Sequence, residues 1–404
     1  MANTVSKAAI YTPILDEVIA AGLTSAPLTA GASRIKYNGG NTVKIAKLSV
    51  DGYSDYSRST GYPEGDATLS WEDHLITMDR GVAFNIDVMD EDETQQTLSA
   101  TNIIAEFGRT RSVPELDSYR YSKIFQSIVN DTTVRYGYYA PASATILGTL
   151  QGDIADIQDV IGEQEPLICF ISGTAFKELA QTEQLTRQLG VQNVTGANGI
   201  TTKVYDVDGV QLIPVPSARM KTEYTFGAKG YTAKAWAQDM NWIITSPNAV
   251  VAFMKHNKMK IIPAEDNQTA DAEKVLARMY HDCWVYDNKH DAIYVSLKTA
   301  DAPTIDDLGG TVVAGSGKVT ITLGNAFTKR DEGHEFYYLD TDSATAPTTA
   351  PAVYDEIDLD GYTKITEATG FDVTVAAGDY CVVVALDEND RVIGYSAVAA
   401  GSGS

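Results

Sequence analysis

The sequence predicts an α+β protein with a separate all-β domain at its C-terminus. A chain of 404 residues is long for a single hydrophobic core, so more than one domain is expected. Helix and strand patterns are mixed up to about residue 298, whereas only short strand patterns follow. Residues 299–404 also hold 5 Lys and Arg against 18 Asp and Glu, which is a net charge of −13 out of −23 for the whole chain.

The composition indicates a globular protein and argues against several other classes. Hydrophobic residues make up 44% of the chain and charged residues 21%. No apolar run is long enough for a bilayer span, and Met1–Lys7 does not begin a secretory signal, so we expect no membrane contact and maturation in a cytosol. No cluster of Lys and Arg is present, which argues against a protein that grips nucleic acid by its phosphates. The cysteines, Cys169, Cys283 and Cys381, lie far apart and are expected to be free thiols.

The first hundred residues predict a short helix and an extended arm. Residues 10–21 have a helical pattern, and residues 42–50 alternate as a half-buried strand does. Residues 51–66 are rich in Gly, Ser, Asp and Tyr, which is typical of an exposed loop, and strand patterns return at 68–77 and 82–88. Because compact domains seldom keep so long a loop without a function, we expect an extended arm and not a tight hairpin.

A long helical segment is predicted over residues 97–129. Apolar residues recur at helical spacing on both sides of Pro114. Ser112 and Glu115 match a capping box, with the proline in the first turn of the helix that would follow. The segment is therefore predicted to be kinked or to restart at Pro114, and its length suits a structural spine.

An α/β unit is predicted over residues 145–235. Its elements are a helix at 147–161, a strand at 167–172, a helix at 174–189, and strands at 200–207 and 210–215. Asp208-Gly209, between the last two strands, is a strong hairpin signal. Strands then dominate, and one helix is expected at 270–280. These strands are predicted at 242–245, 250–253, 258–263, 283–286 and 292–297.

The chain changes character after Asp301-Ala302-Pro303, which we interpret as a linker. Short strands are predicted after it at 318–323, 335–339, 363–366, 372–376, 380–386 and 392–398. Short strands at this spacing in about 100 residues are typical of a small β-sandwich with an immunoglobulin-like architecture. The linker and the concentrated acidity predict that this domain folds autonomously.

The sequence offers no catalytic motif and no complete cofactor-binding motif. Gly310 to Lys318 superficially matches a phosphate-binding loop, but Val312 and Val319 stand where that motif needs Gly and Ser or Thr. We therefore expect no enzymatic activity, no catalytic residues and no cofactor.

No complete metal site is predicted either. His281, Cys283 and His290 lie close in sequence but lack a fourth zinc ligand, so a packed cysteine beside surface histidines is expected. Residues 358–360 and 387–390 carry clustered carboxylates that suit calcium, yet neither run completes an EF-hand loop. Solvated acidic turns are the favoured interpretation, and calcium stays a minority alternative.

Three runs of the chain are typical of a known protein family. They are residues 51–66 with Trp71 and Asp79-Arg80-Gly81, residues 113–123, and residues 280–289 with Ile293-Tyr294. These runs resemble those of tailed-bacteriophage major capsid proteins, in particular from phages of Gram-positive bacteria. The resemblance covers roughly residues 5–298 and implies the Hong Kong phage-type capsid fold. It also implies a non-enzymatic shell protein that self-assembles into an icosahedral capsid around double-stranded DNA.

The resemblance implies a division of the chain into the parts of that fold. The parts are an N-terminal arm at 1–40, an E-loop with flanking strands at 41–92, a peripheral domain with a long spine helix at 93–144, an axial domain at 145–235, a peripheral return at 236–300, and an added immunoglobulin-like β-sandwich and tail at 301–404. No long segment precedes the arm, so a separate scaffolding protein is expected. The acidic tail domain is expected on the outside of the shell, because outward charge keeps particles soluble, and an inward position stays the alternative, because acidity alone does not fix the side.

Partners and an assembly surface also follow from the resemblance. We expect hexamers and pentamers of the chain itself, a portal and decoration proteins, and DNA enclosed without sequence-specific binding in a virion assembled in the bacterial cytoplasm. The expected assembly-interface residues are Asp51, Tyr53, Asp55, Tyr56, Arg58, Tyr62, Glu64, Asp66 and Trp71. Lys36, Lys44 and Lys47 lie near the region that is chemically cross-linked in part of the family, but no motif identifies their partners.

Three other functions stay open from the sequence alone. The shell of a cellular nanocompartment has the same fold and would hold cargo enzymes in place of DNA. A surface adhesin is suggested by the acidic β-domain, but the missing secretory signal speaks against it. An enzyme would need an acid–base or metal constellation that the sequence does not offer.

Overall fold

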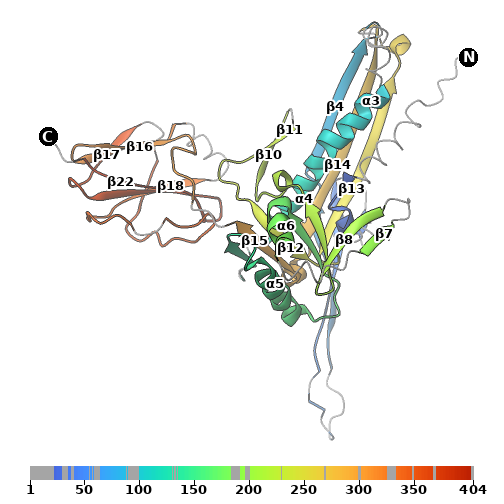
Figure 1. The fold of residues 1–404 in the computed structure, drawn as a ribbon, viewed down its shortest axis with the longest axis horizontal. Coiled ribbons are helices and arrows are strands. Elements are labelled where there is room, and N and C mark those ends of the chain that lie inside the picture. The colour runs from blue at the N-terminus through green and yellow to red at the C-terminus, as the bar shows by residue number, and fades with distance from the viewer. Residues whose placement is uncertain are drawn as a thin grey trace, which may run out of the picture. The chain divides into compact units, whose positions relative to one another are not determined.

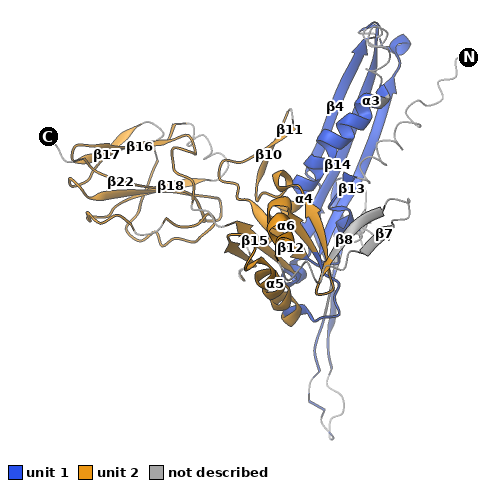
Figure 2. Cartoon of the chain, in the orientation of Figure 1, with its two compact units in different colours: residues 1–120, 160–168, 245–292 blue, residues 121–159, 169–244, 293–404 orange. Residues whose placement is uncertain are grey.

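A computed structural model of the chain describes most of its residues. These are residues 22–29, 35–37, 41–53, 55–56, 58, 64–87, 89, 100–129, 131, 133, 135–182, 192–195, 201–228, 230–267, 270–298, 302–324, 334–347, 350–366 and 370–401. The helix predicted at residues 10–21 lies outside them. The described residues form a mixed α+β protein that divides into two compact units (Figure 2). Unit 1 is Met1–Arg120, Val160–Ile168 and Thr245–Ala292, and unit 2 is Tyr121–Asp159, Cys169–Ile244 and Ile293–Ser404.

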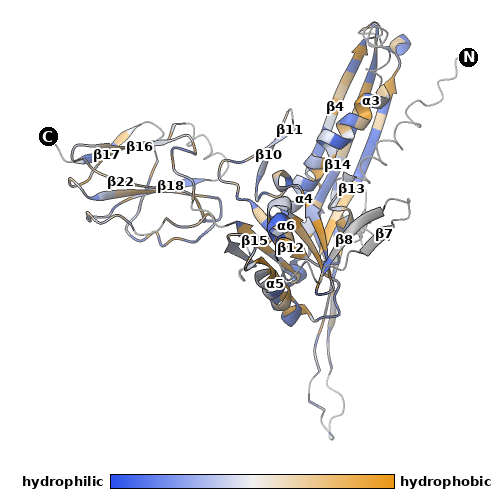
Figure 3. Ribbon diagram, viewed as in Figure 1, coloured by the Kyte–Doolittle hydropathy of each residue, from blue (hydrophilic) through white to orange (hydrophobic). Residues whose placement is uncertain are grey.

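Unit 1 contains an antiparallel sheet of three long strands (Figure 1). Strands β13 (Val250–Ile262), β14 (Ala272–Val285) and β4 (Met78–Asp87) lie in the order β13-β14-β4. Hydrophobic and hydrophilic residues are interspersed along these strands (Figure 3). Ile86 and Val275 belong to a buried cluster that also includes residues of the spine helices, so one face of the sheet forms the core of this unit.

The helix predicted at residues 270–280 is wrong, because these residues belong to strand β14. Ala, Glu, Lys, Leu, Arg and Met in this stretch favour a helix locally. Strand β14 is instead paired on both sides, with β13 and with β4, so partners distant in sequence satisfy its backbone groups. The strands predicted at 250–253 and 258–263 are likewise one strand, β13, with a register shift between Met254 and His256.

The helical segment predicted at residues 97–129 is continuous and does not restart. Helix α3 (Ala100–Phe107) runs through a π-helical turn (Gly108–Ser112) into helix α4 (Val113–Val129). The residues at both ends of the turn keep right-handed helical backbone angles, so the irregularity predicted around Pro114 is a local widening of the helix.

The widening of the helix is explained by Pro114, whose backbone nitrogen carries no hydrogen. The N–H of Val113 donates to the carbonyl of Gly108, five residues earlier, and Pro114 has no N–H to continue the ladder. The predicted capping box is wrong, because Ser112 is the last residue of the π-helical turn and does not begin a new helix. Glu115 instead pairs with a basic side chain of strand β4, as described below.

Two strands of unit 1 form a long ribbon that extends away from its body (Figure 1). Strands β2 (Thr42–Val50) and β3 (Ala67–Leu75) pair antiparallel along their whole length, and β1 (Ile35–Tyr37) adds to the edge of β2. Residues 51–66 connect the two strands at the tip. The extended arm predicted from the sequence is therefore confirmed as a ribbon with a long tip.

Unit 2 contains a mixed seven-stranded sheet in the order β5-β15-β12-β6-β9-β8-β7. The strands are β5 (Tyr136–Tyr139), β15 (Ile293–Lys298), β12 (Met240–Thr245), β6 (Ile168–Ser172), β9 (Val210–Val215), β8 (Thr201–Val207) and β7 (Gln192–Thr195). The central strands β12 and β6 are buried along their full length, as is usual for strands covered on both faces.

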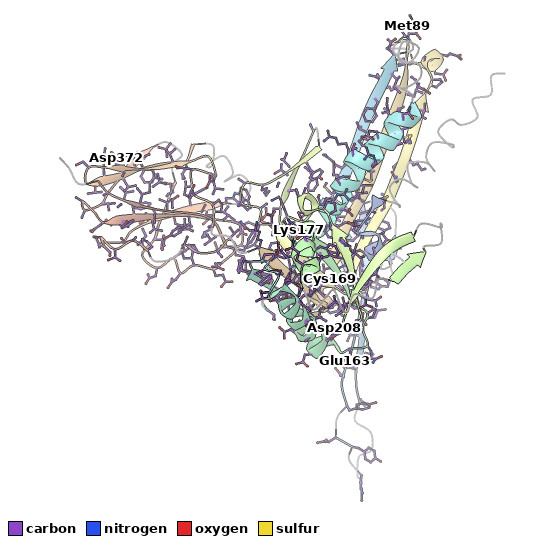
Figure 4. All side chains as sticks on the ribbon, in the orientation of Figure 1. Met89, Glu163, Cys169, Lys177, Asp208 and Asp372 are labelled. Carbon is purple, nitrogen blue, oxygen red and sulfur yellow. The ribbon has the colours of Figure 1, made fainter. Side chains whose placement is uncertain are left out.

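Several predicted elements of this unit are confirmed. Helix α5 (Ile146–Ile161) matches the predicted amphipathic pattern. Helix α6 (Gly173–Ala180) covers only the first part of the helix predicted at 174–189, because it ends before Gln181, and residues 183–189 lie outside the described residues. It begins where the Ser172 hydroxyl accepts a hydrogen bond from the N–H of Ala175. Asp208, labelled in Figure 4, and Gly209 both have positive φ, at 52° and 79°, and form the predicted turn between β8 and β9.

Residues 236–300, predicted as a return to the peripheral domain, contribute to both units. Strands β12 and β15 pair with the sheet of unit 2, because β12 lies between β15 and β6 and its backbone needs both neighbours. Of residues 236–300, only Thr245–Ala292 belongs to unit 1. A two-stranded hairpin, β10 (Tyr224–Gly227) with β11 (Gly230–Ala233), completes the part of unit 2 that precedes β12.

The C-terminal part of unit 2 is all-β and holds two sheets. The first, in the order β16-β17-β20, has strands β16 (Thr311–Gly315), β17 (Lys318–Thr322) and β20 (Phe371–Thr374). The second, in the order β19-β18-β21-β22, has strands β18 (Glu335–Asp340), β19 (Thr363–Lys364), β21 (Tyr380–Leu386) and β22 (Val392–Ala399). Each of the short strands predicted here is present, and β16 was not predicted. The loop rejected as a phosphate-binding motif is the β16–β17 hairpin.

One half-buried carboxylate of unit 2 gives a pH-dependent prediction. Asp153 on α5 accepts a hydrogen bond from Trp242 Nε1 at 2.8 Å, and burial raises the pKa of Asp153 to about 6. A pKa above the unfolded value of about 3.9 means that the folded state loses stability as pH rises through this window. Asp153→Asn keeps an acceptor for Trp242 and removes the charge. We expect it to stabilise the protein by about 1 kcal/mol at pH 8, less than the full shift because solvent reaches the group.

Thermal unfolding of the parent and of Asp153→Asn at pH 4.5 and pH 8 measures this difference. The gain should be present at pH 8 and close to zero at pH 4.5. The matched control is Asp159→Asn, which changes an exposed carboxylate on the same helix and should give no comparable gain at pH 8. A gain for Asp153→Asn that is equal at both pH values would contradict the assignment.

Candidate assembly surface

The two faces of the β2–β3 ribbon differ in what covers them. Residues that are directly opposite in the pairing lie on the same face, and the faces alternate along each strand. On one face Val43 and Ile45 are buried. On the other face four large apolar side chains are exposed, and we call this the ribbon outer face. Its residues are Val50, Leu69, Trp71 and Leu75, with exposed fractions of 66%, 57%, 40% and 53%.

An exposed apolar face on a two-stranded ribbon needs an explanation. Isolated hairpins are only marginally stable in water, and contiguous exposed apolar residues mark interaction sites or aggregation hazards. Strand β3 is also an edge of its three-stranded sheet, with its outer N–H and C=O groups available to a partner. The ribbon outer face therefore has the properties of a surface that another protein covers.

The ribbon tip holds most of the interface residues predicted from the sequence. Its two ends are tied together, because the N–H of Asp66 donates to the Asp51 carboxylate at 2.9 Å and the N–H of Asp51 donates to the Asp66 carbonyl at 3.0 Å. Tyr53 and Tyr56 are exposed, with Tyr53 as open to solvent as a free residue. The remaining residues of the tip that were predicted and are described are also exposed; they are Asp55, Arg58 and Glu64.

Two of the predicted residues stand apart from this group. Tyr62 lies outside the described residues. Trp71 lies on the ribbon outer face and not at the tip. The sequence prediction missed Val50, Leu69 and Leu75, although the alternation along residues 67–75 carried the signal. Large apolar side chains occur at Leu69, two residues later at Trp71, and again at Leu75.

The root of the ribbon is held to the body of unit 1 by an apolar cluster. Val43, Ile45 and Ile76 pack with Trp284 of β14 and its neighbours. Pairs across the two strands add electrostatic support, with Lys44 Nζ 3.0 Å from Asp73 Oδ1 and Lys47 Nζ 3.3 Å from Glu72 Oε1. Exposed pairs of this kind contribute about 0–1 kcal/mol each, so the buried cluster supplies most of the anchoring.

A buried carboxylate fixes the turn between the ribbon and strand β4. Asp282 of β14 accepts hydrogen bonds from the Thr77 N–H at 2.8 Å, the Thr77 hydroxyl at 2.9 Å and the Tyr119 hydroxyl at 2.6 Å. The N–H of Cys283 donates to the same carboxylate at 2.8 Å. One side chain thus joins the ribbon root, β14 and the spine helix α4.

Helix α4 also holds the segment that precedes the ribbon. Asp117, which is buried, accepts hydrogen bonds from the N–H of Thr24 at 3.2 Å, its hydroxyl at 2.8 Å and the N–H of Ser25 at 3.1 Å. Arg120 donates to the Ser25 hydroxyl at 3.0 Å. Another residue of this helix, Glu115, pairs with Arg80 of β4, with Arg80 Nε 2.6 Å from Glu115 Oε1. The spine helix therefore supports the ribbon root through polar as well as apolar contacts.

The three thiols and His281 are inaccessible, whereas His290 is half-buried. Cys169, labelled in Figure 4, Cys283 and Cys381 are buried free thiols, and burial raises the pKa of Cys169 and of Cys381. The expectation that His281 is a surface histidine is wrong, because its side chain is buried against Tyr119 in the core of unit 1. Burial, with Arg120 and Arg80 nearby, lowers the pKa of His281 to about 3, so it is neutral at physiological pH.

The acidic turns considered for calcium use their carboxylates internally. Asp387 accepts hydrogen bonds from the N–H groups of Asn389 and Arg391, at 2.8 and 2.9 Å. Asp358 accepts one from the N–H of Asp360 at 3.0 Å. Within the described part of the chain, no group of three or more His, Cys, Asp and Glu is placed to hold a metal ion. In the same residues, no helix is both long enough and apolar enough to cross a membrane.

No protein-family model and no curated protein matches the sequence. Solved structures to which the chain is similar include those of phage capsids, a virus-like particle and, over 30% of this chain, domains of the S-layer protein SbsC. The capsid of cyanophage P-SCSP1u is 13% identical at a TM-score of 0.47, with 65% of this chain and 85% of that chain covered. The mature capsid of bacteriophage PhiM1 is 12% identical at 0.46, with 65% and 83% covered. The virus-like particle from Pyrococcus furiosus is 10% identical at 0.43, with 72% and 100% covered. At these identities and TM-scores, the likeness alone assigns no function.

Proposed function

We propose that the chain is the major capsid protein of a tailed phage, which assembles into a closed icosahedral shell around double-stranded DNA. The observation that carries the proposal is the ribbon outer face. Its four apolar side chains are exposed in a single chain, yet the ribbon root is anchored by a buried cluster and a buried carboxylate. A rigidly held apolar arm suits permanent burial against a neighbouring copy.

The family-typical runs favour a phage capsid over other shells. These runs lie in the ribbon tip, in the spine helix and at the end of β14. They follow one another along the chain in the order that the sequence resemblance implies for the parts of a capsid protein. In this proposal the chain has no enzymatic activity, and its partners are other copies, a separate scaffolding protein, a portal and decoration proteins. The acidic C-terminal strands form an immunoglobulin-like domain on the outer surface, supported by their two sheets and their net charge of −13.

The contents of the particles distinguish the proposal from a nanocompartment shell. The full chain is expressed with its genomic neighbours, and particles are purified after nuclease treatment of the exterior. Double-stranded DNA protected inside the particles is the expected result. Particles that contain a protein cargo and no protected DNA would contradict the phage assignment and support the nanocompartment. A chain that stays monomeric with all its neighbours present would contradict shell formation itself.

A further inference from the structure

The C-terminal β-domain (residues 302–401) contacts the rest of unit 2 at two described places. One is the ring of His334, whose centroid lies 4.9 Å from that of Trp236, and the other is a short strap, residues 351–356. The strap is held to strand β22 by backbone hydrogen bonds from the Tyr354 N–H to the Val392 carbonyl, at 2.7 Å, and from the Val392 N–H to the Asp355 carbonyl, at 2.9 Å. Val353 and Tyr354 are buried although they lie in a connecting segment without a strand. Buried loop residues require partners for their polar groups, and several of these partners come from outside the β-domain.

The side chain of Tyr354 fills a site made by other parts of unit 2. Its ring lies 5.2 Å from the ring of Phe125 on α4, centroid to centroid. Its hydroxyl lies 3.0 Å from Thr222 Oγ1 and 3.0 Å from Glu223 Oε1. Burial, followed by the nearby Glu223 carboxylate, raises the pKa of Tyr354 well above its usual value, so the phenol stays a neutral donor. Glu223 is itself paired with Lys234 at 3.1 Å.

The backbone of the strap is held from the same side. The Tyr136 hydroxyl donates to the Tyr354 carbonyl at 3.2 Å, and the Tyr138 hydroxyl donates to the Val353 carbonyl. Both tyrosines belong to β5, the edge strand of the seven-stranded sheet. Arg391 of the β-domain donates to the Tyr136 hydroxyl at 2.8 Å, so the strap and β5 are joined through a shared network.

Tyr354 adopts a backbone conformation that a tyrosine rarely has. Its φ is 69°, in the left-handed region, which is unfavourable for a residue with a side chain. Such a residue persists only where its surroundings over-determine it. Here its N–H, its carbonyl, its ring and its hydroxyl each have a partner.

We propose that Tyr354 locks the C-terminal β-domain onto the seven-stranded sheet domain, so that the two unfold as one cooperative unit. The β-domain then stabilises the rest of unit 2 and is not an independent domain on a flexible linker. Loss of residues 299–404 would uncover Phe125 and Tyr136 and leave the Thr222 and Glu223 side chains without the Tyr354 hydroxyl. This replaces the expectation of an autonomous domain, and it does not depend on shell assembly, because every contact lies within one chain.

Hydrogen exchange of the full chain, monitored by mass spectrometry, tests the lock. In Tyr354→Ala we expect the peptides that contain β5 and the strap to exchange at least about 10-fold faster than in the parent. Strands β12 and β21, at the centres of the two sheets, should keep their protection, which shows that both parts remain folded. Tyr354→Phe keeps the ring and removes the hydroxyl, and it should give a smaller acceleration of the same peptides.

Tyr337→Ala is the matched control, because Tyr337 lies on β18 of the same domain and its hydroxyl bonds to Glu335 within that domain. It should leave exchange in β5 and the strap unchanged. Parent-like protection of β5 and the strap in Tyr354→Ala would overturn the proposal, as would equal acceleration by Tyr337→Ala. If Tyr354→Ala does not fold, parent-like protection in Tyr354→Phe overturns the role of the hydroxyl contacts.

Discussion

Leu69→Asp is expected to abolish particle formation while the single chain keeps its folded stability. Leu69 lies on the ribbon outer face and is more than half exposed, so a charge there costs the monomer no more than about 0.5 kcal/mol. In a shell that buries this face, the carboxylate would lose its hydration against apolar neighbours, which costs several kcal/mol at every copy of the contact. Particle yield should therefore fall by at least about 10-fold.

Thr68→Asp supplies the matched control for this substitution. Thr68 is the preceding residue of β3, is also exposed, and points to the opposite face of the ribbon. It adds the same charge at nearly the same place, and particles should form at close to the parent yield. Sedimentation of assembly mixtures and thermal melts of the soluble chains provide both readouts. Parent-like yield with Leu69→Asp would show that the ribbon outer face is not an assembly surface.

Asp282→Ala is expected to give the largest loss of folding stability, about 3–5 kcal/mol. The Asp282 carboxylate is almost completely buried and accepts hydrogen bonds from Thr77, Tyr119 and the Cys283 N–H. Removing it leaves several buried donors without an acceptor, and each unsatisfied donor costs about 1–3 kcal/mol. Burial, with the Asp282 charge as the next cause, raises the pKa of Tyr119, so this hydroxyl remains a donor at any ordinary pH.

Two further variants should lose less folding stability than Asp282→Ala and serve for comparison. Tyr119→Phe removes a single donor and should cost about 1–2 kcal/mol. Asp79→Ala breaks an ion pair with Arg278 at the surface of the same sheet, and it should cost no more than about 1 kcal/mol. Urea unfolding at pH 7 measures all three values. If Asp282→Ala loses less than 1 kcal/mol, the carboxylate does not hold the ribbon root.

Local sequence patterns predicted the elements that are determined by residues close together in the sequence. The apolar spacing of residues 147–161 gave helix α5, and Asp208-Gly209 gave the β8–β9 turn because both positions need positive φ. The strands of the ribbon followed from the strand patterns at residues 42–50 and 68–77, the second of which the structure has at Ala67–Leu75. The exposed loop between them was also evident, because Gly, Ser and Asp there cannot build a core.

Other features depend on residues that are distant in sequence. Strand β14 has helix-favouring residues, and only its pairing with β4 and β13 makes it a strand. The contact between Tyr136 and Tyr354 joins residues 218 positions apart, and no local pattern of a connecting strap indicates it. The apolar face of the ribbon was readable in principle, but which face lies inward is decided by the cluster around Trp284.

Single-particle electron microscopy of particles formed by the full chain tests the central claim most directly. We expect closed shells in which Val50, Leu69, Trp71 and Leu75 of each copy are buried against a neighbouring copy, with the ribbon root unchanged. Closed shells in which this face stays open to solvent would contradict the role of the ribbon. Preparations that contain no closed shells, with all genomic neighbours present, would contradict the proposed function.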